Sequence, residues 1–138
     1  LSHKENVMKR AFSLIEIIFV IVILGIIVSF AAPKLMDTKD SALVSTLKRD
    51  VNTAINSIQS YYLLNQKIDD IKDAINIGDT NWDIEKLKMR DKNSCIKLEI
   101  KKNQNIVSID VQVDSAKDST ICKKIRDSGL VSKVYEVY

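Results

Sequence analysis

The sequence predicts an α+β protein in which one long N-terminal helix is followed by a small antiparallel β-sheet. Three observations support this fold class. The segment from Ile17 to Ala32 holds no charged residue, although 28% of the 138 residues are charged. Apolar residues then recur at helical spacing as far as Leu64, and from Ile96 to Val113 they alternate with polar residues. Helical spacing produces one buried helix face, and alternation produces one buried strand face.

The apolar segment is long enough to cross a membrane. From Phe12 to Ala32 it would form a helix of about 31 Å, which matches a bilayer core of about 30 Å. Lys9 and Arg10 stand just before it. The positive-inside rule therefore predicts a cytoplasmic N-terminus, with the C-terminal part of the chain sent across the membrane.

A secretory signal peptide is the alternative for this segment. Basic and apolar regions are followed by Ser29-Phe30-Ala31, the small-x-small pattern of a cleavage site. Against this alternative, the apolar run is longer than the usual length of about 7–15 residues. It also contains Glu16, which is unusual in such a region.

Glu16 is the one carboxylate at the start of the apolar segment. A carboxylate deep in the membrane costs roughly 2.5–3.5 kcal/mol or more, so a partner is expected. No Lys or Arg lies on the apolar segment that could pair with this carboxylate. A cut before Phe12 would create an α-ammonium group one helical turn away in the same chain, or beside Glu16 of a neighbouring chain. The other interpretation is that Glu16 lies at the headgroup boundary without a role, and the residues alone leave both open.

The sequence Lys9-Arg10-Ala11-Phe12-Ser13-Leu14-Ile15-Glu16, followed by the apolar run, resembles the class III signal of type IV prepilins, pseudopilins and competence pilins. In that family a prepilin peptidase cleaves before the Phe and methylates the new N-terminus. The resemblance implies cleavage between Ala11 and Phe12, and it makes Glu16 the assembly residue. Gly25 and Pro33 are similar to the Gly and Pro of a pilin stretch that loses helicity in assembled filaments. The match covers about residues 9–33.

The leader departs from the family pattern in two ways. Ala11 stands where Gly is usual, which implies slower cleavage or a peptidase that accepts Ala. The leader is also long when it is counted from Leu1, and Met8 to Ala11 would be sufficient, so the natural start is Leu1 or Met8. The presence of Glu16 argues against a tip-capping minor pseudopilin, because that type typically lacks this residue.

Four regions follow from the pattern: a leader (1–11), a transmembrane and filament-core helix (12–33), an amphipathic outer half of the helix (34–64) and a globular head (65–138). Pro33 is expected to kink the helix without necessarily ending it. The apolar stripe of the outer half comprises Leu35, Leu43, Leu47, Val51, Ala54, Ile55, Ile58, Tyr61 and Tyr62. The stripe predicts a surface against which the chain's own head packs, and the alternative is a coiled coil with a partner.

The head is expected to be a small antiparallel sheet lying against the outer half of the helix. Ile96 to Lys101 and Val107 to Val113 alternate around Asn103-Gln104-Asn105, which predicts a hairpin. The other predicted elements are a short helix over Ile68–Ile77 ended by Gly78, a helical turn or loop over 82–89, a helix capped by Ser119 or Thr120 and ending at Gly129, and a third strand over 131–138.

The two cysteines, Cys95 and Cys122, both fall on the exported side of the membrane segment. An oxidising compartment and a small core favour a disulfide between them, with two free thiols as the alternative. The bond would close a loop of about 28 residues and contribute roughly 3–4 kcal/mol.

Catalytic chemistry finds little support in the residues. His3 is the one histidine and lies in the expected leader, so no His base and no zinc cluster are predicted. Asp110, Asp114 and Asp118 are weak Ca²⁺ candidates, because they lack the ligand spacing of a calcium loop. We expect no enzyme activity, no cofactor and, at a net charge of +3, no nucleic-acid binding by the isolated subunit.

The resemblance implies a subunit of a homo-oligomeric filament, stored in the inner membrane with its head outside the cytoplasm. The implied partners are the prepilin peptidase, a platform protein in the inner membrane, an assembly ATPase and minor pilins. The alternative is a membrane-anchored or secreted binding module for adhesion or DNA uptake. The sequence leaves open whether the filament is a retractile pilus, a secretion pseudopilus or a competence filament.

Overall fold

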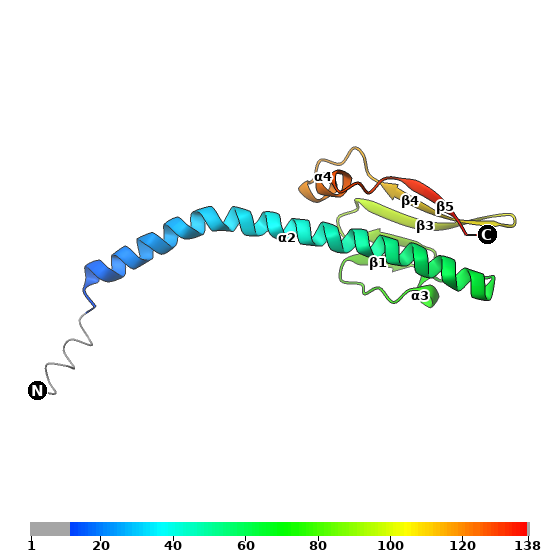
Figure 1. The fold of residues 1–138 in the computed structure, drawn as a ribbon, viewed down its shortest axis with the longest axis horizontal. Helices are drawn as coiled ribbons and strands as arrows, with labels where there is room; N and C mark the ends of the chain where they lie inside the picture. Colours follow the sequence, from blue (N-terminus) through cyan, green and yellow to red (C-terminus); the bar gives the residue numbers. More distant parts are fainter. Residues whose placement is uncertain (1–11, 138) are drawn as a thin grey trace, which may run out of the picture. The chain divides into compact units, whose positions relative to one another are not determined.

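The structure is a computed structural model, and it describes residues 12–137. Its elements are α2 (Leu14–Asn65), α3 (Ile71–Ala74), β1 (Trp82–Glu85), β2 (Lys88–Asp91), β3 (Ile96–Asn103), β4 (Ile106–Val113), α4 (Thr120–Asp127) and β5 (Lys133–Glu136) (Figure 1). The predicted α+β layout, one long N-terminal helix followed by an antiparallel sheet, is confirmed. The chain divides into two units between Lys39 and Asp40, within α2.

Helix α2 passes through Pro33 without ending, as the sequence predicts. The missing N–H of the proline removes one backbone hydrogen bond, but the neighbouring turns continue on both sides. The helix begins at Leu14 and ends at Asn65, against a predicted range from Phe12 to Leu64. A difference of one or two residues at a helix end is the ordinary uncertainty of such boundaries.

The second unit, from Asp40 onward, is held together by the apolar stripe of α2. The buried residues of this helix are Val44, Leu47, Val51, Ala54, Ile55, Ile58 and Tyr62. They form one core with the inward side chains of the sheet, such as Leu98 and Ile109. The head of the chain thus packs against this stripe, as predicted. Leu35 is an exception: it lies in the first unit and is 68% exposed.

The sheet has five strands in the order β1-β2-β3-β4-β5, and all neighbours are antiparallel. The predicted hairpin is its centre, where Leu98 lies opposite Val111 and Ile100 lies opposite Ile109. The predicted last strand is also present as β5, where Tyr135 lies opposite Ile109. Tyr138, at the end of the predicted range, lies outside the described residues.

The prediction of a helical turn or loop over residues 82–89 is wrong, because this segment belongs to the hairpin of β1 and β2. Trp82 and Ile84 alternate with acidic residues, and Met89 and Asp91 point to the same side of the sheet. The buried Asp91 conceals the alternation, since a carboxylate occupies a position where an apolar residue is expected. The turn places Lys86 at φ 35°, a conformation that is rare outside glycine.

The predicted helix over Ile68–Ile77 is much shorter in the structure. Helix α3 is four residues long, capped by Asp70, and Ile75 is already extended. The Ile71 N–H donates to the Lys86 carbonyl at 2.6 Å, which ties α3 to the β1–β2 turn. Ile71 and Ile75 are both buried, although the helix ends at Ala74. Their spacing of four residues therefore reflects two buried positions and not a long helix.

Helix α4 is confirmed together with its cap. The Ser119 hydroxyl accepts a hydrogen bond from the Cys122 N–H at 3.2 Å. At the other end, the Lys48 ammonium of α2 donates to the Ser128 carbonyl at 2.7 Å. A cation at a helix C-terminus compensates the carbonyl groups that have no partner within the helix. This contact fixes α4 against the first turns of the second unit.

Candidate functional site

The N-terminal end of α2 places Glu16 in the first turn of the helix. The Glu16 N–H donates to the Ser13 hydroxyl at 3.2 Å and to the Ser13 carbonyl at 3.0 Å. Ser13-Leu14-Ile15-Glu16 is therefore the sequence of a capping box, in which a serine hydroxyl binds the third N–H of the helix. A carboxylate at this position also benefits from the positive end of the helix dipole.

Phe12 and Glu16, the expected cleavage and assembly residues, both lie on the surface. Phe12 is 71% exposed, and Glu16 is exposed as well. No ion pair within residues 12–137 involves the Glu16 carboxylate. Ala11, on the other side of the expected cleavage point, lies outside the described residues, as do His3 and the basic residues of the leader.

The first unit exposes a continuous apolar surface. Helix α2 contains an 18-residue window with a mean hydropathy of 3.0, none of which is buried within the chain. Within residues 12–137 it is the one helix long and apolar enough to cross a membrane, by length and composition. A soluble monomer rarely leaves so large an apolar surface in water, and a helix of this length and composition could be a single membrane span.

Gly25 and Pro33 both lie inside continuous helix. A Cβ added at Gly25 would meet no atom within 4 Å, so the glycine is not required by packing within this chain. Glycine in a helix interior costs roughly 1 kcal/mol relative to alanine. The structure thus shows helix at both positions, and packing within this chain does not require the glycine.

Cys95 and Cys122 form a disulfide, as predicted, with their Cα atoms 5.2 Å apart. Both residues are buried. The bond joins the residue before β3 to the first turn of α4, and it lies on the same side of the sheet as the core. It therefore links the two ends of a segment that contains β3, β4 and the loop before α4.

Asp91 organises the backbone in front of the disulfide, and the sequence analysis did not identify it. Its carboxylate is 1% exposed and accepts hydrogen bonds from the backbone N–H groups of Cys95 and Ile96, each at 2.7 Å. A third comes from the Asn93 N–H at 3.1 Å. Three N–H donors compensate the loss of hydration of a buried carboxylate. The available signal was an acidic residue at an inward strand position followed by the turn residues Asn93 and Ser94.

The three Ca²⁺ candidates are not brought together. The Asp110 carboxylate binds the Lys101 ammonium at 2.8 Å and accepts from the Gln112 amide at 3.0 Å. The Asp114 carboxylate accepts from the backbone N–H groups of the following turn, those of Ala116 and Lys117. Across residues 12–137, no group of three His, Cys, Asp or Glu side chains could hold a metal ion.

These contacts also shift the acidities of the carboxyl groups. The hydrogen bond from Lys101 is the main cause that lowers the pKa of Asp110, and the nearby positive charges add to it. Backbone hydrogen bonds lower the pKa of Asp114 in the same direction. Both groups thus act as acceptors within their own loops and strands.

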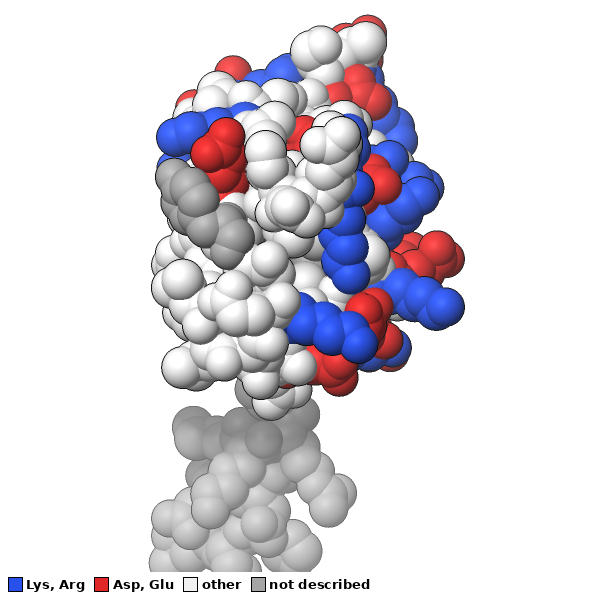
Figure 2. All heavy atoms as spheres, turned by 90° about the vertical axis from the view of Figure 1, so that its right-hand side faces the viewer, with Lys and Arg blue, Asp and Glu red and all other residues white. Residues whose placement is uncertain are grey.

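Charges of both signs are interspersed on the second unit. Figure 2 shows Lys and Arg beside Asp and Glu on the right of the face in view. Uncharged side chains gather on the left of the same face. Residues 51–65, which form the last turns of α2, contain no charged residue. No extended surface of a single sign appears in this view, and such a surface is what binding to a polyanion needs.

Comparison with protein-family models, with curated proteins and with solved structures finds no match to this chain. The resemblance to the pilin family therefore depends on the residues around Glu16 and on the α+β layout.

Proposed function

We propose that the chain is a structural subunit, a pilin or a major-type pseudopilin. It polymerises into a type IV pilus-like or type II secretion filament after cleavage and methylation at Phe12. The observation that carries this proposal is the Glu16 carboxylate, which lies exposed in the first turn of an apolar helix without an ion-pair partner among the described residues.

The physical argument starts from the cost of an unpaired charge. A carboxylate surrounded by apolar helices is strongly unfavourable unless a cation lies beside it. Cleavage before Phe12 supplies an α-ammonium group at the same end of the helix. Pairing of this group with Glu16 of a neighbouring subunit sets the axial position of one helix against the next.

The apolar surface of α2 serves two environments in this proposal. Before assembly it lies in the inner membrane, and after assembly the same surface packs against the helices of other subunits. The prepilin peptidase, a platform protein and an assembly ATPase are the partners that this route requires. The buried disulfide is consistent with a head in an oxidising compartment outside the cytoplasm.

The test uses the full chain expressed in membranes with a prepilin peptidase and the assembly proteins of a host that makes such filaments. N-terminal sequencing should return a methylated Phe12. The Glu16→Gln and Glu16→Ala variants should insert normally and be cleaved, but their assembled fraction should fall at least about tenfold, since removing one partner of a desolvated pair costs several kcal/mol. Asp40→Asn, a neutralised carboxylate outside the apolar segment, is the matched control. Normal assembly of both Glu16 variants would refute the proposal.

A binding module without polymerisation is the second candidate. It is favoured by the compactness of the second unit, which begins at Asp40 and has its own core and disulfide. In that case the apolar helix is an anchor or a signal that is removed. A mature N-terminus at Ala32, or an uncleaved leader in the functional protein, would favour this candidate.

A further inference from the structure

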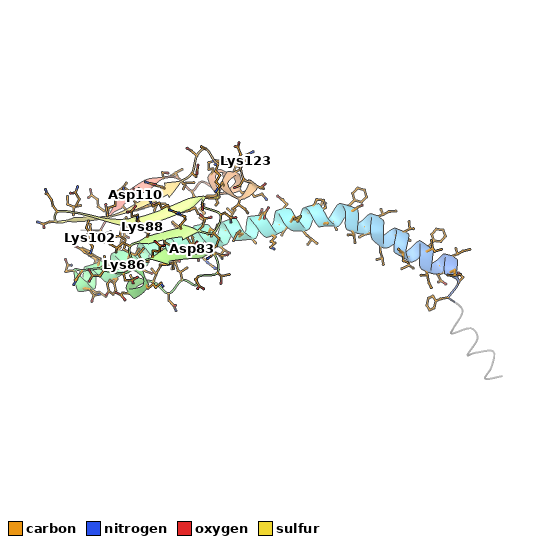
Figure 3. All side chains as sticks on the ribbon, turned by 180° about the vertical axis from the view of Figure 1, so that it is seen from behind. Asp83, Lys86, Lys88, Lys102, Asp110 and Lys123 are labelled. Carbon is orange, nitrogen blue, oxygen red and sulfur yellow. A yellow bond between two sulfur atoms is a disulfide. The ribbon has the colours of Figure 1, made fainter. Side chains whose placement is uncertain are left out.

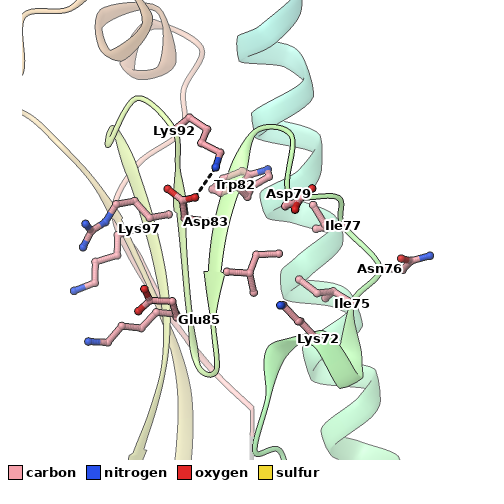
Figure 4. Close-up of a pocket in the computed structure, with 13 residues that line it drawn as sticks. Lys72, Ile75, Asn76, Ile77, Asp79, Trp82, Asp83, Glu85, Lys92 and Lys97 are labelled. Atoms are coloured by element: carbon pink, nitrogen blue, oxygen red, sulfur yellow. Dashed lines mark hydrogen bonds and ion pairs between the residues drawn. The ribbon is translucent and has the colours of Figure 1, made fainter.

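The β1 edge of the sheet carries a hollow that the proposed function does not use. It has a volume of about 680 Å³ and lies between the extended segment after α3 and the strands β1 and β2 (Figure 4). Its β1 side is acidic, with Asp83 and Glu85. Its β2 side is basic, with Lys88 and Arg90, and Lys97 of β3 extends the basic strip.

The basic strip contains an unfavourable contact. Arg90 lies directly opposite Lys97 of β3 on one side and Asp83 of β1 on the other, so only the Lys97 neighbour has the same charge, and like charges at such positions are destabilising. The charges around it are already paired: the Asp83 carboxylate binds the Lys92 ammonium, and the Glu99 carboxylate lies 3.3 Å from the Lys97 ammonium. Arg90 lines the hollow and takes part in none of the ion pairs of residues 12–137.

Helix α4 carries complementary charges on a different part of the same unit. Lys123 and Asp127 are both exposed, and neither has a partner within residues 12–137. They are four residues apart, so they lie one turn apart, about 6 Å along the axis. Figure 3 shows Lys123 on α4 and Asp83 and Lys88 on the sheet. Elsewhere in the unit that starts at Asp40, the described residues show no helix with such an unpaired cation and anion at this spacing.

The spacing of the two surfaces is similar. Arg90 and Glu85 lie on neighbouring strands, two positions out of register, which places their Cα atoms about 7–8 Å apart. Asp127 and Lys123 offer the opposite signs at about the same separation. Each surface can therefore satisfy the charges of the other.

We propose that the hollow of one subunit receives α4 of a second copy of this chain, with Asp127 beside Arg90 and Lys97 and with Lys123 beside Glu85. The contact is heterologous, because it joins two different surfaces, and repeated heterologous contacts generate an open helical filament when the rotation between subunits does not close into a ring. The inference rests on the proposed function, to which it adds the surfaces by which the heads touch.

Charge reversal in the full-length chain, in the assembling host, tests the contact. Arg90→Glu should lower the assembled fraction about tenfold, because it places like charges together at a contact surface. Asp127→Lys should do the same. The double variant, which carries both changes in every chain, should recover part of the assembly, because positions 90 and 127 again carry opposite charges, while Lys97 now lies near a lysine. Arg49→Glu, an equal reversal at an exposed position on α2, is the matched control.

A direct measurement uses the wild-type filament. Subunits labelled with heavy nitrogen are assembled together with unlabelled ones and treated with a carbodiimide, which joins carboxylates to amines in contact. Peptides that link Asp127 to Lys97, or Lys123 to Glu85, should each contain one labelled and one unlabelled partner. Formation of the disulfide in every variant, seen as a mobility shift on reduction, shows that the head has folded.

The outcomes separate this inference from the proposed function. If Glu16 is required for assembly but Arg90→Glu assembles normally, or if the double variant is no better than the single ones, the contact is refuted and the filament stands. Links between other surfaces alone would also refute it. If the wild-type chain does not assemble at all, both proposals fail.

Discussion

The Asp50 carboxylate of α2 accepts a hydrogen bond from the Trp82 indole N–H of β1 at 2.9 Å. Trp82 is fully buried, so this N–H has no access to water. The bond therefore attaches the edge strand of the sheet to the long helix, at a point where apolar contacts alone would leave a polar atom without a partner.

Replacement of Trp82 by Phe should lower the free energy of unfolding of the second unit by about 2–4 kcal/mol. The change removes the donor and also leaves a cavity where the larger ring was. Asp50→Asn keeps an oxygen acceptor and should cost less. Urea unfolding followed by circular dichroism measures both, and equal losses for the two variants would contradict the role of the hydrogen bond.

Replacement of Asp91 by Ala should destabilise the unit by at least about 3 kcal/mol. Three backbone N–H groups would lose a charged acceptor in a buried turn. Asp73→Ala, at an exposed position of α3, is the control and should change stability by less than about 0.5 kcal/mol. Chemical denaturation under oxidising conditions separates this effect from loss of the disulfide. A loss at Asp91 no larger than at Asp73 would show that the turn does not depend on the carboxylate.

Loss of the disulfide should cost roughly 3–4 kcal/mol, either by reduction or in the Cys95→Ser, Cys122→Ser double variant. The bond restricts the unfolded chain between β3 and α4, so its removal mainly increases the freedom of the unfolded state. Thermal unfolding with and without a reducing agent measures the effect. The double variant should be insensitive to the reducing agent, and an equally sensitive variant would point to a different cause.

The ion pair between Asp110 and Lys101 should make the sheet sensitive to acid. Because the pKa of Asp110 is lowered in the folded state, its contribution is complete above the ordinary value of 3.8 and is lost as the pH falls through the folded-state pKa. The pKa of Lys101 is raised by the same partner, so its contribution is lost only in strongly alkaline solution.

The measurement for this pair compares the wild type with Asp110→Asn in urea between pH 2 and pH 7. The difference in stability between them should be largest near neutral pH and should shrink below about pH 3.8. Asp73→Asn, which has no such partner, serves as the control. A difference that stays constant over the whole range would exclude the ion pair as its source.

The sequence predicts those parts of this fold that a single local pattern determines. The central hairpin follows from strict alternation, α4 from its Ser119 cap, and the disulfide from two cysteines that both follow the apolar segment. The β1–β2 hairpin was missed because Asp91 occupies an inward position and obtains its partners from a turn that is visible only in three dimensions. The length of α3 was overestimated because burial at spacing four also suits an irregular segment.

The candidate site divides in the same way. Glu16 and its distance from Phe12 are local features, so the sequence was sufficient to single them out. The pairing of Trp82 with Asp50 and the hollow around Arg90 each depend on which strands become neighbours. No local pattern contains that information, because it comes from the register of the whole sheet.

The order of the strands in the sheet is also their order along the chain. Each new strand therefore finds its neighbour already synthesised and, for β1 to β4, only a short turn away. Short loops make pairing fast, since little chain entropy is lost in closing them. Only β5 is separated from its neighbour by a longer segment, which contains α4. The head can thus grow strand by strand on the helix that precedes it, and its closing step is the addition of the C-terminal edge.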